Sequence, residues 1–219
     1  MFNVVTIARE YGSGGADIGR KVAELMGWEC IDKQIIEHAA KMEKVDRQWA
    51  ESADERSYAW WERVMYGFRN GDPSMDLGAT TPLPVNYDLM QKMTASLIQQ
   101  AAEAGKCVII GRSSQCILRR HPHVLHAAIY APIAEKLERM KVRHPLEKDL
   151  RALLEKKDAD RARYIQTYYK CDGQNHRLYH LCLNSTFGID RCAELIVKAL
   201  QLSGTSMSQP HTQAETQLP

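Results

Sequence analysis

Short runs of β-branched residues alternate with amphipathic segments along this chain, and this pattern predicts its elements. Apolar runs typical of buried strands occupy residues 3–8, 29–31, 107–112, 124–130 and 179–186. Helical patterns occupy residues 17–27, 86–104, 132–143, 146–170 and 189–202, with another helix starting at Asp32 and a short one capped by Ser113 or Ser114. Strands that alternate with helices predict an α/β fold with a parallel sheet covered on both faces.

Two segments depart from this pattern. Residues 43–85 combine crowded aromatic and charged residues with many turn-forming residues, which favours an inserted, partly helical lobe. Residues 203–219 are polar and rich in Ser, Thr and Gln, so we expect a disordered tail. The expected organisation is therefore one domain over residues 1–202, with the insert at about 43–85, followed by the tail at 203–219.

Composition narrows the class of protein. The chain has 219 residues, 44% of them hydrophobic, and a net charge of +2, which argues against a partner such as duplex DNA. No apolar run approaches the roughly 20 residues that span a bilayer, and no signal peptide is evident. The six cysteines have no CxxC spacing, which favours a reduced, cytoplasmic setting. We thus expect no nucleic-acid partner and no membrane association.

The turn after the first strand contains the candidate chemistry. Gly12, Ser13, Gly14, Gly15, Ala16 and Asp17 follow a buried strand and precede a helix. Glycines let backbone N–H groups approach an anion, and the helix dipole favours negative charge there. The turn is therefore either a phosphate cradle or an ordinary strand-to-helix turn, and it does not match the dinucleotide fingerprint GxGxxG.

Several motifs in order resemble a known family. The segments "AREYGSGGADIGRKVAE", "CIDKQII", "VIIGR", "DADRAR" and "LCLNSTFGID" are similar to those of the cytidylate kinase-like proteins, in the P-loop nucleoside monophosphate kinase superfamily. The resemblance covers roughly residues 3–201. It implies a three-layer P-loop NTPase or nucleoside monophosphate kinase-like parallel sheet, an inserted helical acceptor lobe, and a helical lid at about 143–170.

The phosphate loop departs from the pattern GPxGSGKGT of bacterial cytidylate kinases, the relatives of this family. An ungapped comparison places the first glycine on Arg9, the Walker lysine on Gly15 and the metal-binding Ser or Thr on Asp17. Arg9 is the favoured replacement for the lost lysine, because it leaves the strand at the loop itself. Asp17 is either a ligand of Mg²⁺ or a helix N-cap.

The resemblance also implies roles for side chains outside the loop. Arg112 matches the arginine of the family's "GRD" motif, and Arg161 and Arg163 match two lid arginines. The catalytic residues implied are Arg9, Arg112, Arg161 and Arg163, and residues 12–17 would bind the phosphates of ATP. The acceptor would be bound by Asp32, Lys33 and Arg112. The lid would contain Arg139, Arg143 and Asp160, and Asp17 would bind Mg²⁺. The alternatives are an N-cap role for Asp32 and solvated helix faces for the charged residues.

The expected function is ATP-dependent and Mg²⁺-dependent phosphorylation of a nucleoside monophosphate, with CMP or another pyrimidine nucleotide favoured by the resemblance. One rival is a degenerate kinase that binds nucleotide as a sensor or scaffold without efficient catalysis. Another is a kinase for a different small acceptor. The aromatic insert, with Trp49, Trp60 and Trp61 among its residues, is also a candidate homodimer contact.

Overall fold

The computed structural model describes residues 1–32 and 87–203. Its strands form one parallel sheet in the order β2-β3-β1-β4-β5. The strands are β1 Val4–Arg9, β2 Glu29–Ile31, β3 Cys107–Ile110, β4 Val124–Tyr130 and β5 Leu181–Asn184. The helices are α1 Gly15–Met26, α4 Tyr87–Ala104, α5 Ser114–Ile117, α6 Ile133–Arg143, α7 Leu150–Tyr169 and α8 Ile189–Leu202, with 3₁₀ turns η2 His176–Leu178 and η3 Ser185–Phe187.

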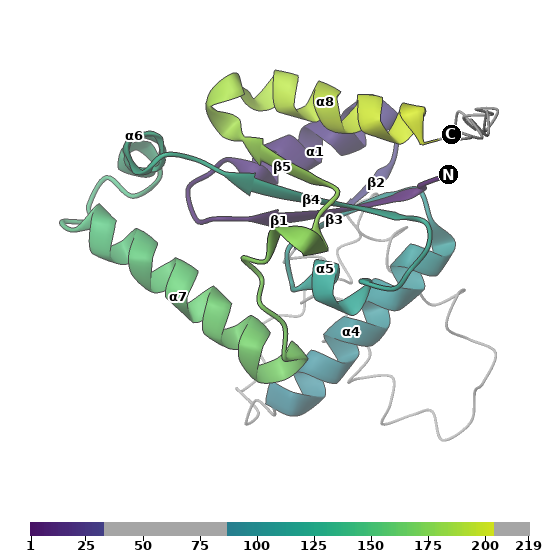
Figure 1. The fold of residues 1–219 in the computed structure, drawn as a ribbon. Helices are drawn as coiled ribbons and strands as arrows, with labels where there is room; N and C mark the ends of the chain where they lie inside the picture. The colour runs from purple at the N-terminus through teal and green to yellow at the C-terminus, as the bar shows by residue number, and fades with distance from the viewer. Residues whose placement is uncertain (33–86, 204–219) are drawn as a thin grey trace, which may run out of the picture.

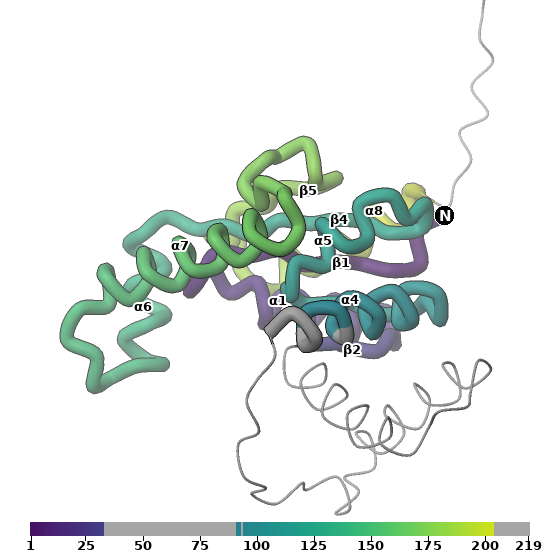
Figure 2. The backbone as a smooth tube through the Cα atoms, turned by 90° about the horizontal axis from the view of Figure 1, so that it is seen from below, coloured from purple at the N-terminus to yellow at the C-terminus, as the bar shows by residue number. Residues whose placement is uncertain are grey.

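Helices cover the two faces of the sheet, so the molecule has three layers. α1 and α8 pack together above the sheet, whereas α4 and α5 lie below it (Figure 1). The view from below shows α7 running out past α5 toward α6 (Figure 2). Parallel strands need such crossover helices, and the crossovers bring all carboxyl ends of the strands to one edge. The predicted α/β parallel architecture is confirmed.

The central strand is buried on both faces. Val5 and Ile7 of β1 have no exposed surface and lie in one cluster with Ile18 and Val22 of α1 and Ile196 of α8. A strand covered on both sides needs apolar residues at consecutive positions, and β1 has them. Its buried position fixes where the chain emerges, and therefore where the loop after β1 stands.

Most predicted elements appear near their expected bounds, with local differences. α1 begins at Gly15, and its N-cap is Gly14 in a left-handed conformation. Asp17 lies inside the first turn and is not the N-cap, which corrects one of the two roles that the sequence left open. The strand expected over residues 179–186 is shorter because Ser185–Phe187 forms a 3₁₀ turn. Lys33, the insert at 43–85 and the tail lie outside the described residues.

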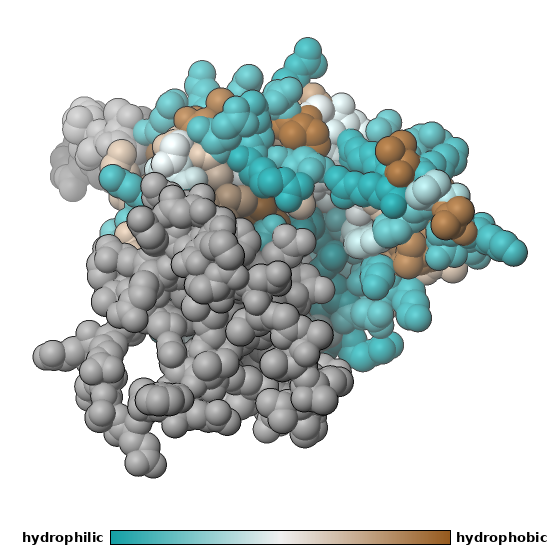
Figure 3. All heavy atoms as spheres, turned by 180° about the vertical axis from the view of Figure 1, so that it is seen from behind, coloured by the Kyte–Doolittle hydropathy of each residue, from teal (hydrophilic) through white to brown (hydrophobic). Residues whose placement is uncertain are grey.

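Among the described residues, no helix has both the length and the apolar character needed to cross a membrane. Hydrophilic residues prevail over the described part of the face in Figure 3, with hydrophobic ones scattered among them. All six cysteines are free thiols, which fits the absence of CxxC pairs in the sequence.

We predict that the seam between α1 and α8 contributes strongly to stability. Ile196 has no exposed surface, whereas its neighbour Leu195 is 45% exposed. Ile196→Ala should lower the free energy of unfolding by about 2–5 kcal/mol, because it leaves a cavity in a packed core. Leu195→Ala, the matched control, should change it by less than about 1 kcal/mol. Urea unfolding of both variants checks this, and equal effects would contradict the packing described.

Candidate functional site

Residues 10–14 form a tight loop between β1 and α1. Gly12 and Gly14 have φ angles of 80° and 79°, which glycine adopts without steric cost. The Ser13 amide and hydroxyl both donate to the carbonyl of Glu10, at 3.3 and 2.9 Å. These contacts curl the chain at the carboxyl edge of the sheet, where ligands of α/β proteins bind.

Open amides make this loop a candidate anion cradle. Within the described residues, the N–H groups of Gly12, Gly14, Gly15 and Ala16 have no intramolecular acceptor. They precede or begin the first turn of α1, at the positive end of the helix dipole. This geometry suits phosphate oxygens, so the loop has the donor arrangement that the cradle interpretation requires.

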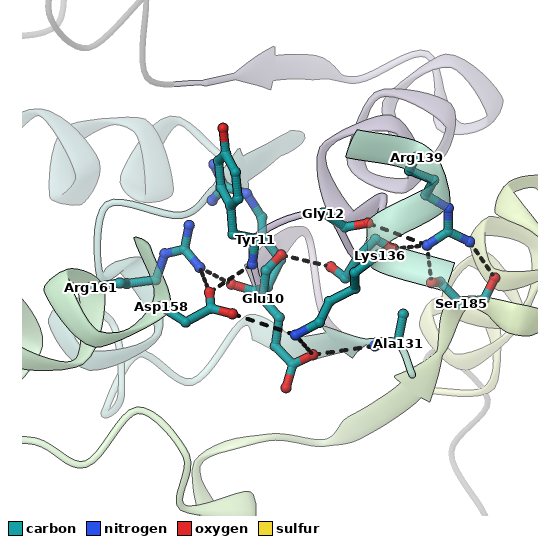
Figure 4. A network of polar contacts seen from close by, with 11 residues as sticks. Glu10, Tyr11, Gly12, Ala131, Lys136, Arg139, Asp158, Arg161 and Ser185 are labelled. Atoms are coloured by element: carbon teal, nitrogen blue, oxygen red, sulfur yellow. Dashed lines mark hydrogen bonds and ion pairs between the residues drawn. The ribbon is translucent and has the colours of Figure 1, made fainter. Parts of the chain in front are cut away.

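Arg139 of α6 braces the outer side of the loop. Its Nη1 donates to the Ser13 carbonyl at 3.0 Å and to Ser185 Oγ at 2.9 Å (Figure 4). Its Nη2 donates to the Ser185 carbonyl at 3.3 Å. Because it contacts carbonyls of the loop, Arg139 joins the loop to the end of β5. The sequence assigned it to the lid, and the structure gives it a bracing position.

Asp17 is held by two arginines. Its Oδ1 accepts from Arg20 and its Oδ2 from Arg143, both at 2.6 Å. Burial raises the pKa of Asp17, but the hydrogen bonds and charges of these arginines outweigh it and keep the pKa below the ordinary value. A Mg²⁺ ion fits an anionic oxygen beside the cradle, and Arg143 would have to release Asp17 to make room for it.

Arg9 and Gly15 depend on each other sterically. A Cβ atom at Gly15 would stand 2.6 Å from the Cβ and 3.4 Å from the Cδ of Arg9. It would also stand 3.2 Å from the Cβ of Ile129. The stem of Arg9 therefore runs through the space that a side chain at position 15 would need. The arginine at 9 and the glycine at 15 therefore share one space.

The guanidinium of Arg9 reaches toward the neighbouring strand β3. A Cβ at Gly111, just after β3, would overlap the Nη1 of Arg9. Burial, followed by the positive charge of Arg161, lowers the pKa of Arg9 to about 10, and Asp32 partly offsets this. Arg9 thus delivers its charge to the side of the loop where β2 and β3 end, near Asp32 and Arg112.

A cavity of about 640 Å³ opens beside these arginines. Arg9, Arg112 and Arg161 line it from β1, from the turn after β3 and from α7. Arg163, two residues beyond Arg161, is 76% exposed and pairs with Asp160 at 3.5 Å. The structure therefore brings three of the four predicted catalytic arginines together and leaves Arg163 and Asp160 on the outer side of α7.

The cavity lining also includes groups that are polar but mostly uncharged. Gln115, Tyr164, Gln174, His176 and Tyr179 line it. Tyr179 donates its hydroxyl to the Gly173 carbonyl at 2.6 Å. Asp32 does not line this cavity, although its charge acts on Arg9. The cavity lining therefore combines three arginines with the carboxylates of Glu10 and Asp158 and with neutral polar and aromatic groups.

Sequence reasoning missed a group of residues around the loop. Glu10, Lys136 and Asp158 form a connected set of ion pairs beneath it (Figure 4). Glu10 lies beside the glycine motif, and Asp158 lies three residues before Arg161, so both had a positional signal. Lys136 had none, because a single lysine on an amphipathic helix resembles any solvated residue.

The chain matches the model of a known protein family. The model of the cytidylate kinase-like family matches residues 4–186, well over half of the chain. The chain belongs to the cytidylate kinase-like family. The resemblance of the sequence motifs to this family is therefore confirmed. The curated proteins contain no significant match.

Solved structures share the fold. An uncharacterized protein from Eubacterium ventriosum ATCC 27560 superimposes with a TM-score of 0.65 and 20% identity, covering 90% of this chain and 98% of that one. Shikimate kinase from Acinetobacter baumannii in complex with shikimate gives 0.47 at 14% identity, covering 93% and 96%. A gluconokinase from Sinorhizobium meliloti 1021 gives 0.48 at 13% identity, covering 93% and 98%. Identities this low show the fold alone, and the two lower scores carry no argument. The P-loop kinase fold of this family member agrees with the fold class predicted.

We predict that Arg9 and Gly15 are coupled in stability. Gly15→Lys alone should lower the free energy of unfolding by about 1–3 kcal/mol, because its Cβ meets the stem of Arg9. In an Arg9→Gly background the same change should cost less by at least about 1 kcal/mol. Chemical unfolding of the wild type, both single variants and the double variant measures this coupling. Additive effects would show that the two positions do not share one space.

Proposed function

We propose that the protein transfers the terminal phosphoryl group of ATP to a nucleoside monophosphate, with CMP or another pyrimidine nucleotide as the favoured acceptor. The observation that carries this proposal is the convergence of Arg9, Arg112 and Arg161, from three separate elements, on one cavity beside an open amide loop. The family match and the fold support phosphoryl transfer in general. The pyrimidine preference rests on the family resemblance.

The loop and the arginines would divide the work of binding and transfer. The open N–H groups of Gly12, Gly14, Gly15 and Ala16 would hold the phosphates of ATP, since they face no other acceptor in the described residues. Phosphoryl transfer depends mainly on positioning and on neutralising charge in the transition state. Arginines that are fixed before the reaction can stabilise that charge without reorganising.

The acceptor would occupy the cavity with its phosphate toward the arginines. Three like charges lie close enough that Arg161 and Arg112 both lower the pKa of Arg9. An anion between them would relieve this repulsion. The neutral groups of the lining, with Tyr164 and Tyr179 among them, would then meet the sugar or the base. Asp32 would act through Arg9, and Lys33 stays a prediction of the sequence.

Asp17 would bind the Mg²⁺ ion. When bound, Mg²⁺ neutralises charge on the phosphates of ATP. Asp17 lies in the first turn of α1, directly after the loop, and its carboxylate oxygens are suitable ligands for Mg²⁺. Its two arginine partners compete with the metal, and Arg143 is the partner that comes from a different element. Release of Arg143 from α1 would therefore accompany binding of the metal.

One observation favours a second candidate function. Position 15, where the comparison with bacterial cytidylate kinases places their lysine, is glycine, and the Arg9 guanidinium points toward Gly111. Losing one preorganised donor typically costs about 10²- to 10³-fold in rate. A protein that binds nucleotide without efficient turnover, acting as a sensor or scaffold, fits this loop as well. Transfer to a different small acceptor would use the same arginines.

A nucleotide panel separates these functions. Thermal shifts with ATP, ADP, CMP, UMP, AMP and GMP, with and without Mg²⁺, identify what binds. An assay of ADP formation then tests each ligand as acceptor. Turnover that requires a monophosphate supports the proposed kinase. Nucleotide binding without turnover favours the sensor, and no nucleotide binding at all contradicts both.

We predict that the cavity arginines act on turnover more than on ATP affinity. Arg112→Ala and Arg161→Ala should each lower kcat by about 10²- to 10³-fold, because they meet charge that develops during transfer. The ATP dissociation constant should change less than about tenfold. Arg151→Ala, an exposed arginine of α7, is the matched control. Unchanged kcat in the two cavity variants would contradict the assignment, and Arg163→Ala in the same assay tests the remaining predicted arginine.

A further inference from the structure

Two hydrogen-bond donors and one ion-pair partner, from three elements, converge on the carboxylate of Asp158. The Tyr11 amide donates to its Oδ1 at 2.7 Å, and Arg161 Nη1 donates to the same oxygen at 2.9 Å. Lys136 Nζ lies 3.5 Å from its Oδ2 (Figure 4). Tyr11 belongs to the loop itself, whereas Lys136 comes from α6 and Arg161 from α7. The Asp158 carboxylate therefore lies at the rim of the cradle, so the anion at this position is part of the protein itself.

Lys136 is an unusual member of this group because it is nearly buried. Its side chain is only 11% exposed. A buried ammonium is costly unless it is paired, and Lys136 is paired with Glu10 Oε2 at 3.1 Å as well as with Asp158. Glu10 Oε2 also accepts from the Ala131 amide at 3.3 Å, after β4. The cation is thus fixed against the loop instead of being extended into solvent.

Packing holds Asp158 in this place. A Cβ at Gly12 would lie 3.1 Å from Leu154 Cδ2 and 3.2 Å from Lys136 Cβ, so α6 and α7 press directly on the loop. Arg161 Nη1 also donates to the Arg9 carbonyl at 2.6 Å. α7 is therefore docked on the loop, and the Asp158 carboxylate is part of that docking surface.

We propose that the Tyr11 amide, Lys136 and Arg161 form the binding site for the terminal phosphate of ATP, and that Asp158 occupies this site until ATP arrives. This rests on the proposed function, in which the loop binds ATP. Two cations and one amide at the edge of a phosphate cradle match a phosphate group better than a carboxylate, which carries less charge and fewer oxygens. A phosphate and a carboxylate would repel each other there, so one displaces the other.

The proposal predicts that Asp158 affects the binding of ATP and the binding of ADP differently. ATP places its terminal phosphate at the rim and must displace Asp158, whereas ADP ends one phosphate earlier. The negative charge of Asp158 therefore weakens ATP binding and leaves ADP binding largely unchanged. Displacing Asp158 also breaks its hydrogen bond with the Tyr11 amide, so ATP, and not ADP, changes how the turn of α7 around Asp158 meets the loop.

The test is Asp158→Asn in the full chain, with a non-hydrolysable ATP analogue and ADP measured by calorimetry at fixed Mg²⁺. The affinity for the analogue should rise on the order of tenfold relative to ADP, because the isosteric amide removes the competing charge. Glu155→Gln is the matched control, an exposed carboxylate on the same helix. It should leave the ratio of the two affinities unchanged. An unchanged or reduced ratio in Asp158→Asn overturns the proposal.

A second measurement uses the wild type and does not depend on the variant folding. Hydrogen–deuterium exchange of α7 peptides that contain Asp158 should differ between the ATP-analogue complex and the ADP complex, because only the analogue displaces this carboxylate from the loop. Equal protection in both complexes overturns the proposal.

The outcomes also separate this inference from the proposed function. A shifted affinity ratio without transfer to any monophosphate supports the site and contradicts the kinase. Transfer to a monophosphate with an unshifted ratio does the reverse. Absence of binding by both ATP and ADP contradicts both.

Discussion

The side chain of Arg9 can lie beside the first turn of α1 only because residue 15 has no side chain. β1 is buried on both faces, so its last residue emerges at a fixed point under the loop. The stem of Arg9 then fills the space beside Ile129 that a lysine at 15 would cross. Gly111 likewise leaves room for the guanidinium of Arg9, where a Cβ atom would overlap its Nη1.

Burial of Arg9 is electrostatically unfavourable, because it removes the charged side chain from water. Its pKa falls to about 10 through burial and through the nearby positive charge of Arg161. The carboxylate of Asp32, just after β2, offsets part of the effect on Arg9, and Asp158 on α7 pairs with Arg161. The protein holds its cations in place with internal anions, and a phosphate ligand offers a stronger counter-charge than any of them. A site of this kind is assembled before its ligand arrives, which lowers the cost of reorganisation.

α6 and α7 are parts of the site as well as its cover. Arg139 holds loop carbonyls from outside, Lys136 lies against Gly12, and Arg161 reaches the carbonyl of Arg9. A movement of either helix would therefore change the charges around the loop. This arrangement links helix docking to ligand binding through contacts of defined geometry, which distinguishes it from a mobile cover that only excludes water.

The sequence by itself determined the order of elements and the nature of the loop. Periodicity is a local property, so the strands, the helices and the glycine turn followed from neighbouring residues, and the motif order indicated the family. The tertiary structure decided which charges meet. Arg161 and Arg163 look equivalent in sequence, yet only Arg161 faces the cavity, because α7 docks with Leu154 against Gly12. Lys136 and Asp158 are 22 residues apart and meet the loop only after α6 and α7 have packed on it. Such contacts depend on how helices approach one another, and no local pattern encodes that approach.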